Sequence, residues 1–163
     1  MPYTVPSSFF RKALVLIVAI LLLDQWSKMA VLAYFKPESN HPIEVTSFFN
    51  IVLVWNKGIS FGLFSHNEYS PLVFVAIAIM ITLMMLAWLK KADNMLLATA
   101  LSLVVGGAIG NVIDRIRLGA VVDFLDFYLG SYHWPAFNVA DSAICVGVFL
   151  LSIDGLLIKK KAV

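Results

Sequence analysis

Two aspartates lie beside long apolar runs, where a charged side chain is costly. Asp123 follows Val121 and Val122, and Asp141 lies just inside an apolar run that begins near Phe137. A carboxylate close to hydrocarbon is usually retained for a function. Two carboxyl groups that lie close together can hold one proton between them, so this pair could act as a general acid and base.

The composition is that of an integral membrane protein. The 163 residues are 61% hydrophobic and 13% charged, and the mean hydropathy of +0.89 is too high for an ordinary soluble domain. Twelve lysines and arginines against ten acids leave a formal charge of +2. So small an excess argues against nucleic-acid binding, which requires a basic stripe. We treat residues 1–163 as a single membrane-embedded domain.

Four apolar stretches are long enough to cross ~30 Å of hydrocarbon as helices. We expect the membrane spans at approximately residues 13–35, 71–89, 95–113 and 137–158. The expected fold class is therefore an integral membrane protein that is mainly α-helical. The N-terminal basic pair and apolar run also suit a secretory signal, but no small-residue cleavage site follows, so we expect a retained span.

The distribution of lysine and arginine predicts the orientation in the membrane. Basic residues gather at the N-terminus, in the link between the second and third spans, and at the C-terminus. With four spans these places share one side, and the positive-inside tendency makes that side cytoplasmic. Both termini are then cytoplasmic, and the connections at about 36–70 and 114–136 face outward. Asp123 and Asp141 consequently fall near the outer surface.

The first outward connection has a residue pattern typical of β structure. Residues 48–55 are rich in β-branched and aromatic side chains, which predicts a strand. Asn56, Lys57 and Gly58 form a turn signal, and residues 59–64 alternate like a second strand. We expect a small extracytoplasmic β-rich region. A group of aromatic residues further along the chain is typical of the membrane interface: Tyr128, Tyr132, Trp134 and Phe137.

Polar residues at helical spacing could support the aspartate pair. Asn138 and Asp141 are spaced i, i+3, which places them on one face at the start of the fourth span. A first-turn acid is also favoured by the helix dipole, which is a purely structural reason for Asp141. In the first span Asp24 and Lys28 are spaced i, i+4, so we expect them to neutralise each other.

The third span carries a second polar group at its outer end. Asn111, Asp114 and Arg115 lie near one helix face. We expect Asp114 to be satisfied by its neighbour Arg115 in a structural ion pair that closes the helix end. Further back in this span, Gly106 and Gly110 have the Gly-x-x-x-Gly spacing that allows two helices to pack closely.

Other common catalytic arrangements are missing from the sequence. The three histidines are far apart, no His-Glu-x-x-His motif occurs, and the single Cys145 cannot form a disulfide within the chain. There is no Gly-x-Ser-x-Gly motif and no glycine-rich phosphate loop. We therefore expect no metal and no cofactor.

Five sequence blocks resemble the signature of the lipoprotein signal peptidases, the signal peptidase II family of aspartic peptidases. In chain order the blocks are Asp24-Gln25-x-Ser27-Lys28, Asn56-x-Gly58, Gly110-Asn111-x-x-Asp114-Arg115, Val121-Val122-Asp123-Phe124 and Phe137-Asn138-x-Ala140-Asp141-Ser142. The blocks extend over nearly the whole chain. One departure is Ile59-Ser60 after Gly58, where many members have two alanines.

The resemblance implies an aspartic endopeptidase of the bacterial inner membrane, with its active site near the periplasmic face. Such an enzyme removes the signal peptide from diacylglyceryl-modified prolipoproteins by cleaving before the lipidated cysteine. Its expected partners are this precursor and membrane lipids, with no nucleic acid and no obligate protein partner. The catalytic pair maps onto Asp123 and Asp141. The supporting positions map onto Asp24, Lys28, Asn56, Gly58, Asn111, Asp114, Arg115 and Asn138.

The residues alone leave two other functions open. A small proton-coupled or ion transporter could use the same intramembrane acids, although the chain shows no duplicated half and no pair of broken helices. A non-enzymatic membrane adapter would tolerate neutralisation of both aspartates, whereas a peptidase would not.

Overall fold

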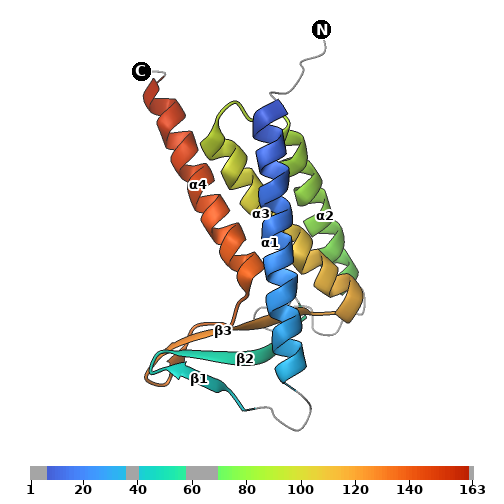
Figure 1. Cartoon of the computed structure of the whole chain (residues 1–163), viewed down its shortest axis with the longest axis vertical. Coiled ribbons are helices and arrows are strands. Elements are labelled where there is room, and N and C mark those ends of the chain that lie inside the picture. Colours follow the sequence, from blue (N-terminus) through green and yellow to red (C-terminus); the bar gives the residue numbers. More distant parts are fainter. Residues whose placement is uncertain (1–6, 36–40, 58–69, 162–163) are drawn as a thin grey trace.

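The computed structural model describes residues 7–35, 41–57 and 70–161. Within these ranges four helices stand side by side, and a small antiparallel sheet lies at one end of them (Figure 1). The helices are α1 (Ser7–Tyr34), α2 (Ser70–Leu89), α3 (Met95–Leu118) and α4 (Val139–Lys161). The strands are β1 (Ile43–Thr46), β2 (Phe49–Asn56), β3 (Val121–Leu129) and β4 (Tyr132–His133).

The helices have the length and the apolar surface expected of membrane spans. Three segments are long and apolar enough to cross a bilayer, and they are Phe9–Tyr34, Met95–Leu118 and Val139–Leu157. The helix α2 has 20 residues and contains a shorter apolar segment, Val75–Leu89. Large apolar side chains such as Leu22, Met84 and Phe149 are more than half exposed on the helices, as they are when lipid surrounds a protein. The predicted fold class is confirmed.

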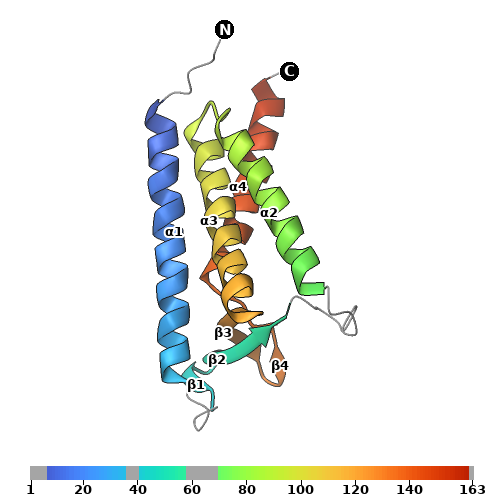
Figure 2. The same cartoon turned by 90° about the vertical axis from the view of Figure 1, so that its right-hand side faces the viewer.

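The helix α3 is the centre of the bundle. It packs against α1, α2 and α4, and Figure 2 shows it between α1 and α2 with α4 behind. Gly106 and Gly110 face α1, so the predicted close packing at these glycines is confirmed. The helix begins at the N-cap Asn94 and continues beyond residue 113 to Leu118. It ends at Gly119, whose φ of 74° is a left-handed conformation that favours glycine.

The sheet is built from segments that are far apart in the sequence. Its strand order is β1-β2-β3-β4, and each neighbouring pair is antiparallel. The strand predicted at residues 48–55 is confirmed as β2. Its partners among the described residues are β1 and β3, while the second strand predicted at residues 59–64 lies outside the described residues. The strand β3 was not predicted, because the sequence between the third and fourth spans was treated as a connection.

A small apolar cluster joins the sheet to the bundle. Val31 and Phe35 at the end of α1 pack against Val122 and Phe124 of β3, and all four side chains are buried. This packing holds β3 against the helices, so the residue between the two β3 members, Asp123, is fixed relative to the bundle.

Candidate active site

Asp141 is held by a reciprocal cap at the start of α4. Asn138 is the residue that precedes this helix, and its side-chain oxygen accepts a hydrogen bond of 2.9 Å from the backbone N–H of Asp141. The Asp141 carboxylate in turn accepts a bond of 3.3 Å from the backbone N–H of Asn138. This is the arrangement of a capping box, in which two orphan N–H groups of a helix are satisfied at once.

The same asparagine also reaches Asp123 on β3. The Asn138 side-chain amide donates a hydrogen bond of 2.7 Å to Asp123 Oδ1, and Asn138 itself is fully buried. The other carboxylate oxygen, Asp123 Oδ2, accepts a bond of 2.9 Å from the side-chain amide of Asn56 on β2. One buried side chain therefore contacts both aspartates and holds them in one site.

The environment of Asp123 favours its protonated form. The residue is only 2% exposed. Burial raises the pKa of Asp123 from its usual 3.8 to about 6, and the negative charge of Asp141 acts in the same direction, against the hydrogen bonds from Asn56 and Asn138. A carboxyl group that keeps its proton up to about pH 6, beside a second carboxylate, can supply the acid of an acid–base pair.

A buried lysine lies at the centre of the polar network behind the pair. Lys28 Nζ is 2.9 Å from a carboxylate oxygen of Asp24 and 2.9 Å from one of Asp114, and it donates a bond of 3.0 Å to Asn111 Oδ1. The amide of Asn111 then donates a bond of 2.8 Å to Asp141 Oδ1. The lysine is thus connected to the aspartate pair through one amide.

These contacts confirm one predicted ion pair and correct another. The expected pairing of Asp24 with Lys28 is present. The expected pairing of Asp114 with Arg115 is wrong, because the salt-bridge partner of Asp114 is Lys28. Packing of α1 against α3 brings this lysine to the carboxylate, which also accepts a bond of 3.2 Å from the backbone N–H of Val122.

Further hydrogen bonds made by Asp24 and Gln25 tie the helices together around the site. Asp24 Oδ1 accepts a bond of 2.9 Å from the backbone N–H of Ala140, in the first turn of α4. Gln25, which was not predicted as a site residue, donates to Asp24, to Asp114 and to the Gly110 carbonyl oxygen. Its position inside the first sequence block was the only signal that could have identified it.

Arg115 and Gly58 are the predicted site residues that have not yet been described. Arg115 is half-buried, donates a bond of 3.4 Å to the Asn111 carbonyl oxygen, and is attracted by the charges of Asp141, Asp123 and Asp114. The predicted site residues on α1, β2, α3, β3 and α4 are therefore brought together by the fold. Gly58 and the neighbouring residues 59–60 lie outside the described residues.

A cavity of about 430 Å³ opens beside Asp123. Its wall is formed by the end of β2, by Asp123 and by the segment before α4, and its lining residues are Val54, Trp55, Asn56, Lys57, Asp123, Pro135 and Ala136. It gives one of the two aspartates access to a ligand. Across the described ranges, no three histidine, cysteine or acidic side chains are grouped as they would be to hold a metal ion.

Comparison with known proteins agrees with this geometry. Residues 16–157 match the family described as signal peptidase (SPase) II. The lipoprotein signal peptidase of Syntrophotalea carbinolica is 46% identical over 145 residues, which are 87% of this chain and 89% of the relative. The lipoprotein signal peptidase of Burkholderia cenocepacia is 47% identical over 139 residues, which are 84% of this chain and 82% of the relative.

Two solved structures have the same fold. Both are described as a bacterial membrane enzyme determined by the in meso method, and both are 31% identical to this chain. One, at 2.3 Å resolution, has a TM-score of 0.80 and covers 92% of this chain and 90% of its own. The other, at 1.9 Å, has a TM-score of 0.78 and covers 89% and 92%. The chain therefore belongs to the signal peptidase II family of aspartic peptidases and is a multi-pass bacterial membrane protein.

Proposed function

We propose that Asp123 and Asp141 are the catalytic pair with which this peptidase removes signal peptides from prolipoproteins. The observation that carries the assignment is that one buried residue, Asn138, donates to both carboxylates beside an open cavity, to Asp123 from its side-chain amide and to Asp141 from its backbone N–H. The pKa of Asp123, which burial raises to about 6, favours the retention of a proton by this carboxyl group and supports the same assignment.

The proposed reaction is water attack assisted by both carboxyl groups. The ionised carboxylate takes a proton from a water molecule, and the protonated partner donates its proton to the carbonyl oxygen of the scissile peptide. The water oxygen bonds to the carbonyl carbon and forms a tetrahedral intermediate. The carbon–nitrogen bond then breaks as the carboxyl group that took the water proton gives it to the leaving amine. A hydroxyl proton of the intermediate passes to the other carboxylate, so that a carboxylic acid and an amine are released and the pair is restored. The proton belongs to the pair, which titrates as a unit.

The supporting residues are proposed to orient this pair. Asn56 and Asn138 donate to Asp123, and Asn111 donates to Asp141, so both carboxylates have fixed directions. Lys28 and Asp24 hold Asn111 and the first turn of α4 in place. Positioning of this kind contributes to catalysis because a small misplacement of the reacting groups is costly.

The finer features of the substrate and location are also proposals. We infer that the precursor carries a diacylglyceryl group and that cleavage occurs before the modified cysteine, so membrane lipids and the lipid anchor are partners. We infer a location in the inner membrane with both termini cytoplasmic, because basic residues gather at the N-terminus, the C-terminus and in the connection between α2 and α3.

The test removes the charge of each aspartate with a side chain of the same size and shape. Asp123→Asn and Asp141→Asn, purified and incubated with lipidated precursor, are expected to lose cleavage by at least about a thousandfold, as catalytic groups do. The matched control is Asp126→Asn, which alters another buried aspartate on the same strand β3 and is expected to retain most activity. Near-normal cleavage by either dyad variant would exclude the pair.

A second measurement tests the substrate. The unmodified protein is incubated with lipidated and with unlipidated precursor, and the products are resolved by mass. We expect a product that begins at the modified cysteine from the lipidated precursor only. Equal cleavage of the two precursors would show that the lipid is not recognised.

A further inference from the structure

One face of the outer half of β3 carries a row of apolar side chains. Alternate residues of a strand point to the same face, so Leu125, Phe127 and Leu129 share one face of β3. Across the sheet, Phe49 is opposite Phe127, and their rings stack with centroids 4.7 Å apart. The apolar surface therefore continues from β3 onto β2.

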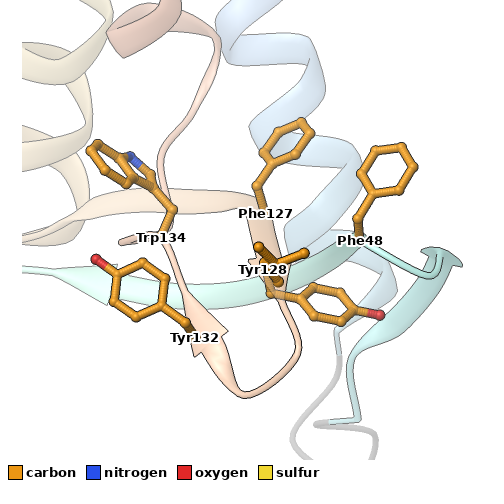
Figure 3. Close-up of a pocket in the computed structure, with 6 residues that line it drawn as sticks. Phe48, Phe127, Tyr128, Tyr132 and Trp134 are labelled. Atoms are coloured by element: carbon orange, nitrogen blue, oxygen red, sulfur yellow. The ribbon is translucent and has the colours of Figure 1, made fainter.

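The outer part of this surface is an exposed aromatic cluster. We call Phe48, Phe127, Leu129, Tyr132 and Trp134 the aromatic face. Its side chains are between 40% and 84% exposed, with Leu129 the most exposed. With Tyr128 they line a shallow hollow of about 210 Å³. In Figure 3 the rings of Phe48, Phe127 and Trp134 rise from the strands on the side where the helices lie.

The opposite face of the same sheet is polar. Glu44, Asn50 and Asp126 are aligned across β1, β2 and β3 in one row of paired residues. Asp126 accepts a bond of 3.2 Å from the Asn50 amide, and His133 Nδ1 lies 2.9 Å from Asp126 Oδ1. The sheet is therefore amphipathic, with charges on one side and aromatic rings on the other.

We propose that the aromatic face docks into the interfacial layer of the lipid bilayer that surrounds the helices. The face looks toward the helices and lies in the segments that lead into α4, whose apolar span begins at Val139. Phe137, which immediately precedes the N-cap of α4, stacks on Phe127 with ring centroids 5.8 Å apart. The aromatic face is thus continuous with the lipid-facing surface of the bundle.

The residue types suit this layer better than water or a dry protein core. Tyrosine and tryptophan combine an apolar ring with a polar group, and they are enriched where hydrocarbon meets headgroups. No member of the aromatic face carries a charge, whereas the polar row on the opposite face includes two acids. Insertion of the aromatic side leaves those acids directed toward water.

Docking would set the depth of the active site, and this consequence rests on the proposed catalytic role of Asp123. Phe127 is four positions after Asp123 along the strand, a distance of ~13 Å. A sheet that lies flat at the interface would hold the aspartate at the level of a bond close to a lipid anchor. The aromatic face would then act as an anchor that complements the four helices.

The test measures the depth of single labelled positions in liposomes of phosphatidylethanolamine and phosphatidylglycerol. The native Cys145 is replaced by serine, and a nitroxide is attached to Leu129→Cys on the aromatic face or to Glu44→Cys on the polar face. Collision of the nitroxide with oxygen, which concentrates in lipid, is compared with collision with a water-soluble nickel complex. We expect the oxygen-to-nickel ratio to be several times higher at position 129 than at position 44. A label at Tyr132→Cys serves if the variant at 129 does not fold.

The measurement separates docking from catalysis because it requires no turnover and can be repeated in the Asp123→Asn background. Equal, water-like ratios at positions 129 and 44 would overturn the proposal. The proposal would also be overturned if position 129 were protected from nickel only after precursor is added. That result would show that the substrate, and not lipid, covers the aromatic face. Spin–spin broadening at position 129 would show that a second copy of the chain covers the aromatic face, and this result would also overturn the proposal. None of these outcomes would alter the cleavage assay on the dyad variants.

Discussion

At the scale of residues, Asn138 determines the geometry of the site. The oxygen and the nitrogen of its side-chain amide make different hydrogen bonds. The oxygen caps α4 through the N–H of Asp141, and the nitrogen donates to Asp123. The bond to the helix N–H therefore fixes the orientation of the amide. In that orientation the amide nitrogen points toward Asp123. A residue that can only accept or only donate cannot replace both contacts.

Replacement of this residue gives the first prediction. Asn138→Ala removes a helix cap, which costs about 1 kcal/mol, and it also leaves Asp123 with one hydrogen bond fewer. We expect a small fall in melting temperature but a loss of cleavage of at least about tenfold, since the carboxylate loses its fixed direction. The control is Ser152→Ala, which removes a hydroxyl bonded to the Val148 carbonyl on the exposed side of α4. Parallel losses of activity in both variants would contradict a positioning role.

The pKa of Asp123 gives the second prediction. The folded-state pKa is about 6 and the ordinary value is 3.8, so folding favours the protonated carboxyl group. This contribution to stability is fully present below pH 3.8 and is lost as the pH rises through about 6. A difference of about two pKa units corresponds to about 3 kcal/mol as an upper value.

The measurement compares the native chain with Asp123→Asn in thermal unfolding experiments in detergent between pH 4.5 and 7.5. The asparagine does not titrate, so the native chain is expected to lose stability relative to the variant as the pH rises. Identical pH dependence of the two proteins would show that the carboxyl group is not protonated by burial.

At the scale of elements, the site depends on how closely α3 approaches its neighbours. A Cβ atom added to Gly110 would lie 2.5 Å from Asp24 Oδ2 and 3.6 Å from the Cβ of Ala140. The glycine therefore allows α1, α3 and α4 to meet at one point. At that point Asp24 bonds both Lys28 and the first turn of α4.

This close approach gives the third prediction. Gly110→Ala must displace Asp24 or separate α1 from α3, and we expect a loss of stability of about 1–3 kcal/mol, typical of overpacking, together with loss of cleavage. The matched control is Gly155→Ala in α4, where an added Cβ meets nothing within 4 Å. That variant should be neutral or more stable by up to about 1 kcal/mol, because alanine favours helix. Unfolding in detergent and cleavage assays would compare the two.

At the scale of the whole molecule, the sheet lies at the opposite extreme of the bundle from the start of α1 and the end of α4. The described ends of α1 and α4 lie at one extreme, and the strands lie at the other (Figure 1). The connection between α2 and α3, which contains Lys90 and Lys91, is at the same extreme as the start of α1 and the end of α4 (Figure 2). The basic residues that predicted the orientation therefore gather on one side of the molecule.

The fourth prediction concerns this orientation. In a Cys145→Ser background, a membrane-impermeant maleimide added to intact cells should label Ser131→Cys, which lies exposed in the turn between β3 and β4. Asp93→Cys, exposed in the connection between α2 and α3, should react only after the inner membrane is permeabilised. The reverse pattern would place the aspartate pair on the cytoplasmic side.

Much of the fold and the site could be predicted because the signals are local. A run of apolar residues long enough for the bilayer predicts a helix wherever its neighbours pack. The pairing of Asp24 with Lys28 and the contact of Asn138 with Asp141 follow from helical spacing, and both are present. The strand β3 was not predicted, because Asp123 and Asp126 interrupt the apolar pattern of a strand. Its pairing with β2 is visible only in the structure.

The sequence by itself determined the membrane character and the family, and it predicted the two aspartates as the catalytic pair. Only the tertiary structure decided how they are held. Asp114 is paired with Lys28 on another helix, not with the adjacent Arg115, because packing of α1 on α3 brings the lysine closer. The burial of Asp123 and its contact with Asn138 require β3 to lie against the first turn of α4. Spacing along a helix fixes local neighbours, but partners on different elements depend on how those elements pack.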